Sequence, residues 1–114
     1  MATNINKQTA PGFWSTTGLV LTETAIDTGN GNETGSGSDI LLLARNTHAT
    51  NAYTFTITSQ PDPVYGRSGN VNAVSLAAGE LRLFRLTGPG WADANGKINF
   101  TAQNAAVKVS LVQL

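Results

Sequence analysis

Apolar and polar side chains alternate along much of this chain in short runs, and this alternation predicts β-strands. The clearest run is residues 52–58, where Tyr53, Phe55 and Ile57 share one face and threonines occupy the other. A period of two residues indicates a strand with one buried face. Residues 106–112 repeat the alternation, with two valines and a leucine on the apolar face.

Further runs predict strands at residues 18–26, 39–45, 71–76, 81–86 and 97–101. The run at 39–45 has an unbroken apolar centre, which is typical of a strand buried on both faces. Gly79 lies between 71–76 and 81–86, so we expect a hairpin in which Gly79 takes a positive φ. The core predicted from all the runs consists of Tyr53, Phe55, Ile57, Leu81, Leu83, Val107, Val109 and Leu111.

No segment shows the period of a helix, and glycine, asparagine and proline separate the runs. We therefore predict an all-β fold, an antiparallel β-sandwich or barrel (jelly-roll-like) of about seven to eight short strands. Residues 1–16 are polar and lack a core pattern, so we expect an extended N-terminal arm there. A single β-sandwich domain is expected at 17–114, because 114 residues suit one domain.

The chain carries unusually little charge. Charged residues make up 12% of it, about half the usual share, and seven basic and seven acidic residues leave no net charge. Such a surface repels its neighbours weakly, which suits packing against other subunits. Because there is no basic excess, we expect no nucleic-acid partner and no membrane partner.

The sequence contains no cysteine, which excludes disulfides, thiol catalysis and cysteine-bound zinc. The first residues are polar and show no apolar signal region. We therefore expect the protein to be made, and at first to reside, in a cytoplasm.

The glycine-rich loop at 27–38 is the main candidate for ligand chemistry. It lacks the Lys-Ser/Thr pair of a phosphate-binding loop, and a strand rather than a helix is predicted to follow it. Its oxygen ligands could suit calcium, but their spacing fits no known loop pattern and the residue types are those of turns. These candidate ligands are Asp27, Asn30, Asn32, Glu33 and Asp39. We expect no metal site and no cofactor.

His48 is the single histidine of the chain and lies between two predicted strands. A nucleophilic triad would need a serine on a strained turn, and no Gly-x-Ser-x-Gly motif occurs. The carboxylates are scattered, and their spacing suggests no pair for glycoside hydrolysis. We interpret His48 as a solvated turn residue and predict that the protein has no catalytic residues and is not an enzyme.

Three aromatic residues lie outside the alternating strand faces: Phe13, Trp14 and Trp91. An aromatic residue in a loop often caps the open end of a sandwich, and tryptophan is also enriched at protein interfaces. For Trp91 both alternatives stay open. For Phe13 and Trp14 we favour an interface, because the arm has no core of its own. Tyr65, in the loop at 60–70, is a further candidate for partner binding.

Several segments of the chain follow one another in a recognisable order of predicted strands and turns. They are Thr17-Gly-Leu, a polar Gly/Asn stretch before Ile40-Leu-Leu-Leu-Ala-Arg-Asn46, Tyr53-Thr-Phe-Thr-Ile57, Val74-Ser-Leu-Ala-Ala-Gly-Glu80, Gly88-Pro-Gly-Trp91 and Val107-Lys-Val-Ser-Leu-Val112. Together, from about Thr17 to Leu114, they resemble small β-sandwich proteins of tailed-phage heads, the capsid decoration (cement) proteins. The long loop between Pro61 and Asn70 departs from that pattern.

The resemblance implies a virion protein that binds the outer surface of the shell formed by the major capsid protein and stabilises it, without a cofactor. It also implies a homotrimer, because such sites commonly lie at local three-fold axes. We expect the arm to add a strand to an exposed capsid sheet edge, with Phe13 and Trp14 as the anchor.

Two alternatives stay open. One places the protein in the neck, the head-completion complex or the tail of the virion. The other makes it a small carbohydrate-binding β-sandwich, in which Trp91 and Tyr65 stack on sugars and loop asparagines hydrogen-bond to them.

Overall fold

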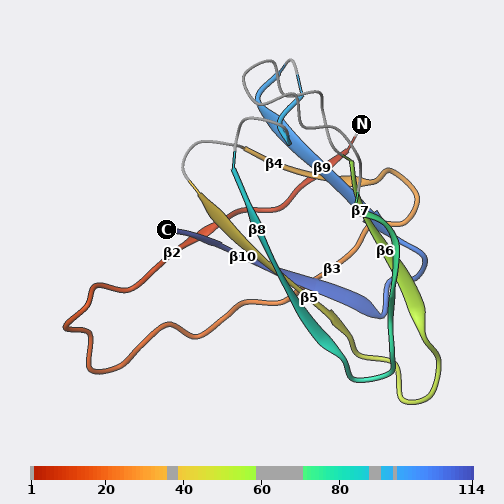
Figure 1. The fold of residues 1–114 in the computed structure, drawn as a ribbon, viewed down its shortest axis with the longest axis horizontal. Coiled ribbons are helices and arrows are strands. Elements are labelled where there is room, and N and C mark those ends of the chain that lie inside the picture. The colour runs from red at the N-terminus through yellow and green to blue at the C-terminus, as the bar shows by residue number, and fades with distance from the viewer. Residues whose placement is uncertain (1, 36–38, 59–70, 88–90, 94) are drawn as a thin grey trace.

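The computed structural model describes residues 2–35, 39–58, 71–87, 91–93 and 95–114 (Figure 1). The secondary-structure elements of this part of the chain are all β-strands, so the predicted all-β class is confirmed. The strands are β1 (Thr3–Asn4), β2 (Gln8–Thr9), β3 (Thr24–Ala25), β4 (Asn32–Gly35), β5 (Ile40–Asn46), β6 (Tyr53–Thr58), β7 (Val71–Leu76), β8 (Leu81–Leu86), β9 (Lys97–Ala102) and β10 (Val107–Gln113).

The described strands form two five-stranded sheets. The first has the order β1-β4-β9-β6-β7, and the second has the order β2-β10-β5-β8, with β3 also paired to β10. Most neighbours are antiparallel, but β1 pairs with β4, and β2 with β10, in parallel. The two sheets are therefore mixed and do not close into a barrel, and their arrangement is sandwich-like.

The strand count differs from the prediction because of the N-terminal third. One long strand was expected at 18–26, whereas the described residues up to Gly35 contribute four short strands, β1 to β4. Of the expected strand only Thr24–Ala25 pairs. Its partner β10 has one edge against β5, and on the other edge β3 pairs at Lys108 and Val109 while β2 pairs at Val112 and Gln113. β2 therefore occupies the part of the edge that a longer antiparallel strand at 18–26 would need.

Residues 2–9 join the two sheets instead of extending away from them as the expected arm. β1 pairs with β4 in the first sheet, and β2 pairs with β10 in the second. Between these strands the side chain of Ile5 is buried in the core. The segment that does project from the fold follows β2 and is described below.

The turn at Gly79 is present, but the predicted hairpin is wrong. Gly79 has the expected positive φ, 78°. However, β7 pairs with β6 in the first sheet, and β8 pairs with β5 in the second. The chain therefore crosses between sheets at this turn. A hairpin and a crossover corner have the same local pattern, and only the distant partner strands distinguish them.

One hydrophobic core lies between the sheets. Its buried members include the predicted residues Phe55, Ile57, Val107, Val109 and Leu111, and Tyr53 packs against them half-buried. The prediction is wrong for Leu81 and Leu83, which are 46% and 55% exposed. Phe84 and Leu86 take the inward positions of β8 instead. Apolar residues occur on both faces of this strand, so alternation does not identify the inner face.

The central strand β5 also differs from its prediction. Its alternate residues Ile40, Leu42 and Ala44 are buried, whereas Leu41 and Leu43 are only half-buried. The strand is thus fully buried on one face, and its second face is partly open.

Candidate protein-docking site

A projecting loop, residues 10–23, leaves the second sheet after β2 and returns to it at β3 (Figure 1). Hydrogen bonds hold both limbs at its base. The side chain of Gln8 donates to the carbonyl of Val20 and accepts from the N–H of Thr22, each over 2.9 Å. On the returning limb, Glu23 forms an ion pair with Arg45 of β5, with an N–O distance of 3.0 Å. The loop is therefore presented from a fixed base.

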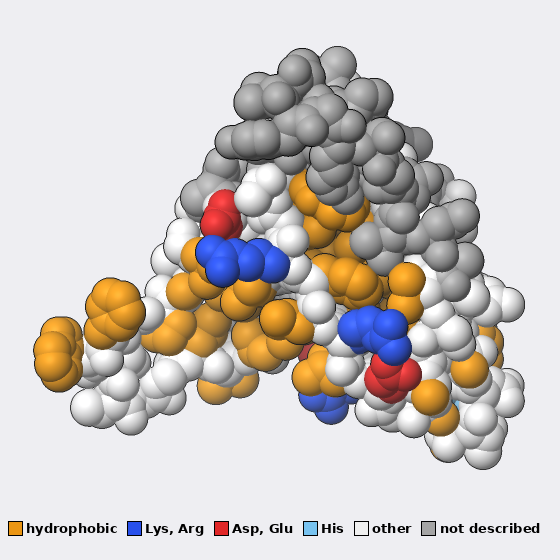
Figure 2. All heavy atoms as spheres, viewed as in Figure 1, with side chains coloured by type: hydrophobic (Ala, Val, Ile, Leu, Met, Phe, Trp, Pro, Cys, Tyr) orange, Lys and Arg blue, Asp and Glu red, His pale blue; other side chains and the backbone are white. Residues whose placement is uncertain are grey.

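The tip of the projecting loop is apolar and exposed. Phe13 and Trp14 are 104% and 94% exposed, as far as a side chain in an extended chain would be. Figure 2 shows hydrophobic side chains at the far end of this loop, away from the rest of the molecule. The N–H of Ser15 bonds to the carbonyl of Gly12, and Gly18 has φ 71°, which reverses the chain just after the aromatic pair. Tryptophan is enriched among the residues that anchor protein interfaces, and both rings could bury a large apolar area in a partner's pocket.

The other aromatic candidates do not join this site within the described residues. Trp91 is 9% exposed and belongs to the hydrophobic core, where its ring packs instead of facing solvent. Tyr65 lies outside the described residues. Stacking a sugar on Trp91 would need an open ring face, so this burial speaks against the carbohydrate-binding alternative as far as Trp91 is concerned.

A second exposed apolar feature, the β8 edge (Leu81–Leu86), was missed by the sequence prediction. Leu81 and Leu83 face outward on this strand, and Leu83 lies opposite the half-buried Leu43 of β5. In Figure 2 hydrophobic side chains lie between two pairs of opposite charges on this face. The two arginines of β8 form exposed ion pairs, Arg82 with Glu80 at 2.6 Å and Arg85 with Asp39 at 2.9 Å. The strand thus combines exposed leucines with neutralised charges.

The candidate calcium loop is organised as a turn by its own hydrogen bonds. The Asp27 carboxylate accepts from the Thr3 hydroxyl at 2.6 Å, from the N–H groups of Gly29 and Asn30, and from the Asn30 side chain. These bonds, that of Thr3 first, lower the pKa of Asp27 to about 2. The Asn32 side chain accepts from the N–H of Asp27. No cluster of three acidic or histidine side chains suited to a metal occurs among the described residues.

His48 lies in the turn between β5 and β6. Its Nδ1 accepts hydrogen bonds from the N–H groups of Thr50 and Asn51 at 3.1 and 2.9 Å. Its ring meets that of Tyr53 edge to face, with 5.4 Å between centroids. These contacts give His48 a role in shaping the turn.

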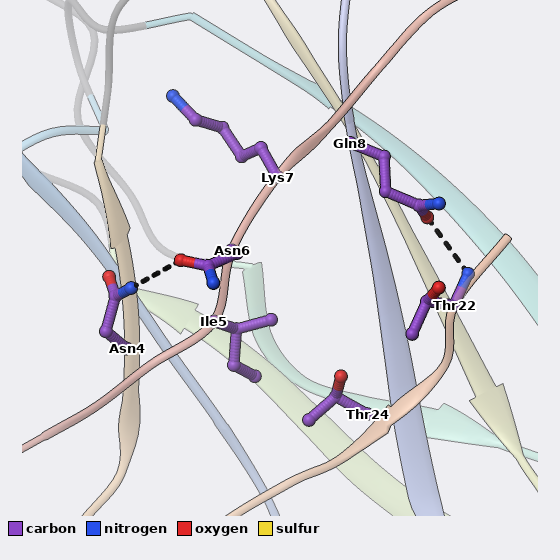
Figure 3. A pocket seen from close by; sticks show the side chains of 7 residues that line it. All are labelled: Asn4, Ile5, Asn6, Lys7, Gln8, Thr22 and Thr24. Carbon is purple, nitrogen blue, oxygen red and sulfur yellow. Dashed lines mark hydrogen bonds between the residues drawn. The ribbon is translucent and has the colours of Figure 1, made fainter.

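A polar hollow of about 330 Å³ lies between the N-terminal segment and the returning limb of the projecting loop (Figure 3). It is lined by Asn4, Ile5, Asn6, Lys7, Gln8, Thr22 and Thr24. Its polar groups bond within the chain: Asn4 donates to Asn6, and the Lys7 ammonium donates to the carbonyl of Gly35 at 2.7 Å. Throughout the described residues no buried polar side-chain atom lacks a partner.

Among the described residues there is no helix long and apolar enough to cross a membrane. Comparison with known proteins returned no matching family model, no similar curated protein and no similar solved structure.

Proposed function

We propose that this protein is a virion structural protein of the decoration (cement) type, which binds the outer surface of a tailed-phage capsid and stabilises it. The observation that carries the proposal is the aromatic pair Phe13 and Trp14, fully exposed at the tip of a loop whose base is fixed. The resemblance of residues 17–114 to decoration proteins supports the capsid as the partner.

The tip has the properties of an anchor that inserts into a pocket of a larger protein. A few hot-spot residues supply most of the binding free energy at many interfaces, and tryptophan is enriched among them. Hydrogen bonds to Gln8 already hold the limbs of the loop, so less conformational entropy is lost on binding than with a free arm. The absence of net charge avoids repulsion between copies crowded on one surface.

Cementing follows from thermodynamic linkage. A protein that binds the closed shell better than its separated subunits adds its binding free energy to the stability of the shell. Because a shell has many equivalent sites, a modest contribution from each bound copy adds up to a large stabilisation of the whole particle.

The test combines copy number with loop variants. Quantitative mass spectrometry of purified particles should give a ratio to the major capsid protein near one. A few copies per particle would instead indicate a neck or tail component, and absence from particles would overturn the virion role.

The loop variant is the double substitution Phe13→Ala with Trp14→Ala, and Leu114→Ala is the control because it removes an apolar side chain, 49% exposed, outside the loop. In co-sedimentation with empty shells we expect the loop variant to bind at least about thirtyfold more weakly, the effect of losing a hot spot. Equal binding of both variants would exclude the loop as the anchor.

A further inference from the structure

The β8 edge has backbone groups that point away from the sheet. β8 is the end of the second sheet, and no described strand pairs with its outer side. The N–H of Asn46 in β5 bonds to the carbonyl of Glu80 over 3.0 Å, so the carbonyl of Glu80 points toward β5. Successive residues of a strand alternate in this direction. The N–H and C=O groups of Leu81, Leu83 and Arg85 therefore point to the open side.

The other outer strands carry features that discourage pairing, whereas β8 does not. β1, β2 and β3 are two residues long, and the pairing of β7 with β6 is irregular between Phe55 and Ile57. β8 pairs with β5 in unbroken register along its whole length. A long and regular outer strand with apolar side chains is a template for another strand.

Charge on an outer strand normally prevents such pairing, and here it is neutralised. Arg82 and Arg85 are the two charged residues of β8, and each is paired with a carboxylate of its own chain, Glu80 or Asp39. An approaching strand therefore meets a nearly neutral row that carries two half-exposed leucines.

We propose that the β8 edge is a homodimer interface, in which the β8 strands of two copies pair antiparallel about a two-fold axis at Leu83. This register places Leu83 opposite Leu83 of the second copy, and Leu81 opposite its Arg85. Only in this register do Leu81, Leu83 and Arg85 of one copy all form backbone hydrogen bonds with the same three residues of the second copy. Arg82 then lies opposite Phe84 of the second copy, so no like charges face each other. A register centred on Arg82 would oppose two arginines, which is unfavourable.

The size of this contact predicts a weak dimer. A strand of six residues is roughly 20 Å long, and two half-exposed leucines per copy add only a small apolar area. The contact is therefore smaller than the about 800 Å² per partner of stable complexes. Pairing should depend on concentration in solution and strengthen where copies are crowded on a surface. The inference is independent of the projecting loop and of what the loop binds.

Sedimentation velocity up to about 1 mM, where even a weak contact is populated, tests the pairing. The mass should rise with concentration from 11.9 kDa toward twice that value. Leu83→Lys and Leu83→Glu should each stay monomeric, because they place like charges at the two-fold axis. A mixture of the two variants should form the dimer again. Val20→Lys, an equally cationic change at a residue 86% exposed on the projecting loop, should dimerise as the unmodified chain does.

Hydrogen exchange gives a residue-level check that needs no variant. On dimerisation the amides of Leu81, Leu83 and Arg85 should gain protection, whereas those of Arg82 and Phe84, already directed at β5, should not change. A chain that stays monomeric at every concentration, or an oligomer that Leu83→Lys leaves intact, would overturn the proposal. A trimer that persists in Leu83→Lys would instead agree with the homotrimer that the resemblance implies. Shell binding is assigned to Phe13 and Trp14, so the Leu83→Lys variant should bind shells as the unmodified chain does. That result would support the proposed function even if the dimer proposal is overturned.

Discussion

The hydroxyl group of Thr3 donates a 2.6 Å hydrogen bond to Oδ2 of Asp27, which ties β1 to the turn before β4. The N–H of Thr3 bonds in addition to the carbonyl of Gly31 in the same turn. The N-terminal strand is thus held to the first sheet by side chain and backbone together. The charge of Asp27 is central to this attachment.

Acid should loosen the attachment. The pKa of Asp27 in the folded protein is about 2, below the value of 3.8 of a free carboxyl. A lowered folded pKa stabilises the fold above the unfolded pKa, and this contribution is lost as the pH falls from about 4 through about 2. The pKa values of Glu80 and Asp93 are lowered as well, so they contribute in the same direction. Thermal unfolding followed by circular dichroism should show a midpoint that falls across this interval.

Asp27→Asn is the matched variant for this prediction. Its amide oxygen can still accept from the turn, but no ionisation remains at the position, so its unfolding midpoint should fall less with acid. An identical pH profile in both proteins would contradict the role assigned to the Asp27 charge.

The two tryptophans should behave in opposite ways. Trp91→Ala removes a core side chain and should lower the free energy of unfolding by about 3–5 kcal/mol. Trp14→Ala removes an exposed one and should change it by no more than about 0.5 kcal/mol. Chemical denaturation measures both. In fluorescence, iodide should quench Trp14 and leave Trp91 largely unaffected, and strong quenching of Trp91 would contradict its burial.

Asn46 should be the most sensitive polar residue of the described core. It is fully buried, and its side-chain amide donates to the carbonyls of Asn51 and Leu76 at 2.8 and 2.9 Å while its oxygen accepts from the N–H of His48. Asn46→Ala leaves these groups without a partner, so we expect a loss of about 2–4 kcal/mol in unfolding free energy. Asn51→Ala, which keeps the backbone acceptor at an exposed position, should cost less than about 0.5 kcal/mol.

The adjacent residues Leu42 and Leu43 test which face of β5 is buried. Leu42 is fully buried in the core, so Leu42→Ala should cost about 2–5 kcal/mol. Leu43 is half-buried on the other face, so Leu43→Ala should cost about 1 kcal/mol. Equal losses, measured by urea unfolding, would indicate that both faces are covered.

The alternation of apolar and polar residues was sufficient to predict the buried side chains where one face of a strand is apolar and the other is polar. This holds for Phe55 and Ile57 in β6 and for Val107 and Val109 in β10, all buried as predicted. It failed in β8, where leucine and arginine each occur in both phases of the alternation. The inner face is decided there by pairing with β5, which places Phe84 beside Leu42 and Leu83 beside Leu43.

The N-terminal region could not be predicted for a different reason. β1 and β2 are two-residue strands without a periodic pattern, and they form because β4 and β10 offer open edges. In the candidate site, the exposure of Phe13 and Trp14 agrees with the absence of an apolar pattern around them. The β8 edge was missed because its leucines were assigned to the core.

The place of β10 at the centre of the second sheet has a consequence for how the protein forms. Three segments of the chain pair with this one strand: β2, β3 and β5, and the partner of Val112 in β2 is Gln8, roughly a hundred residues away. Before β10 is in place, β5 has β8 as its sole described neighbour, and β2 has no strand to pair with. Assembly is therefore dominated by long-range pairing and should be slow, with leucine-rich strands uncovered until it is complete. A nascent chain still lacking β10 is the form of this protein most in need of a chaperone.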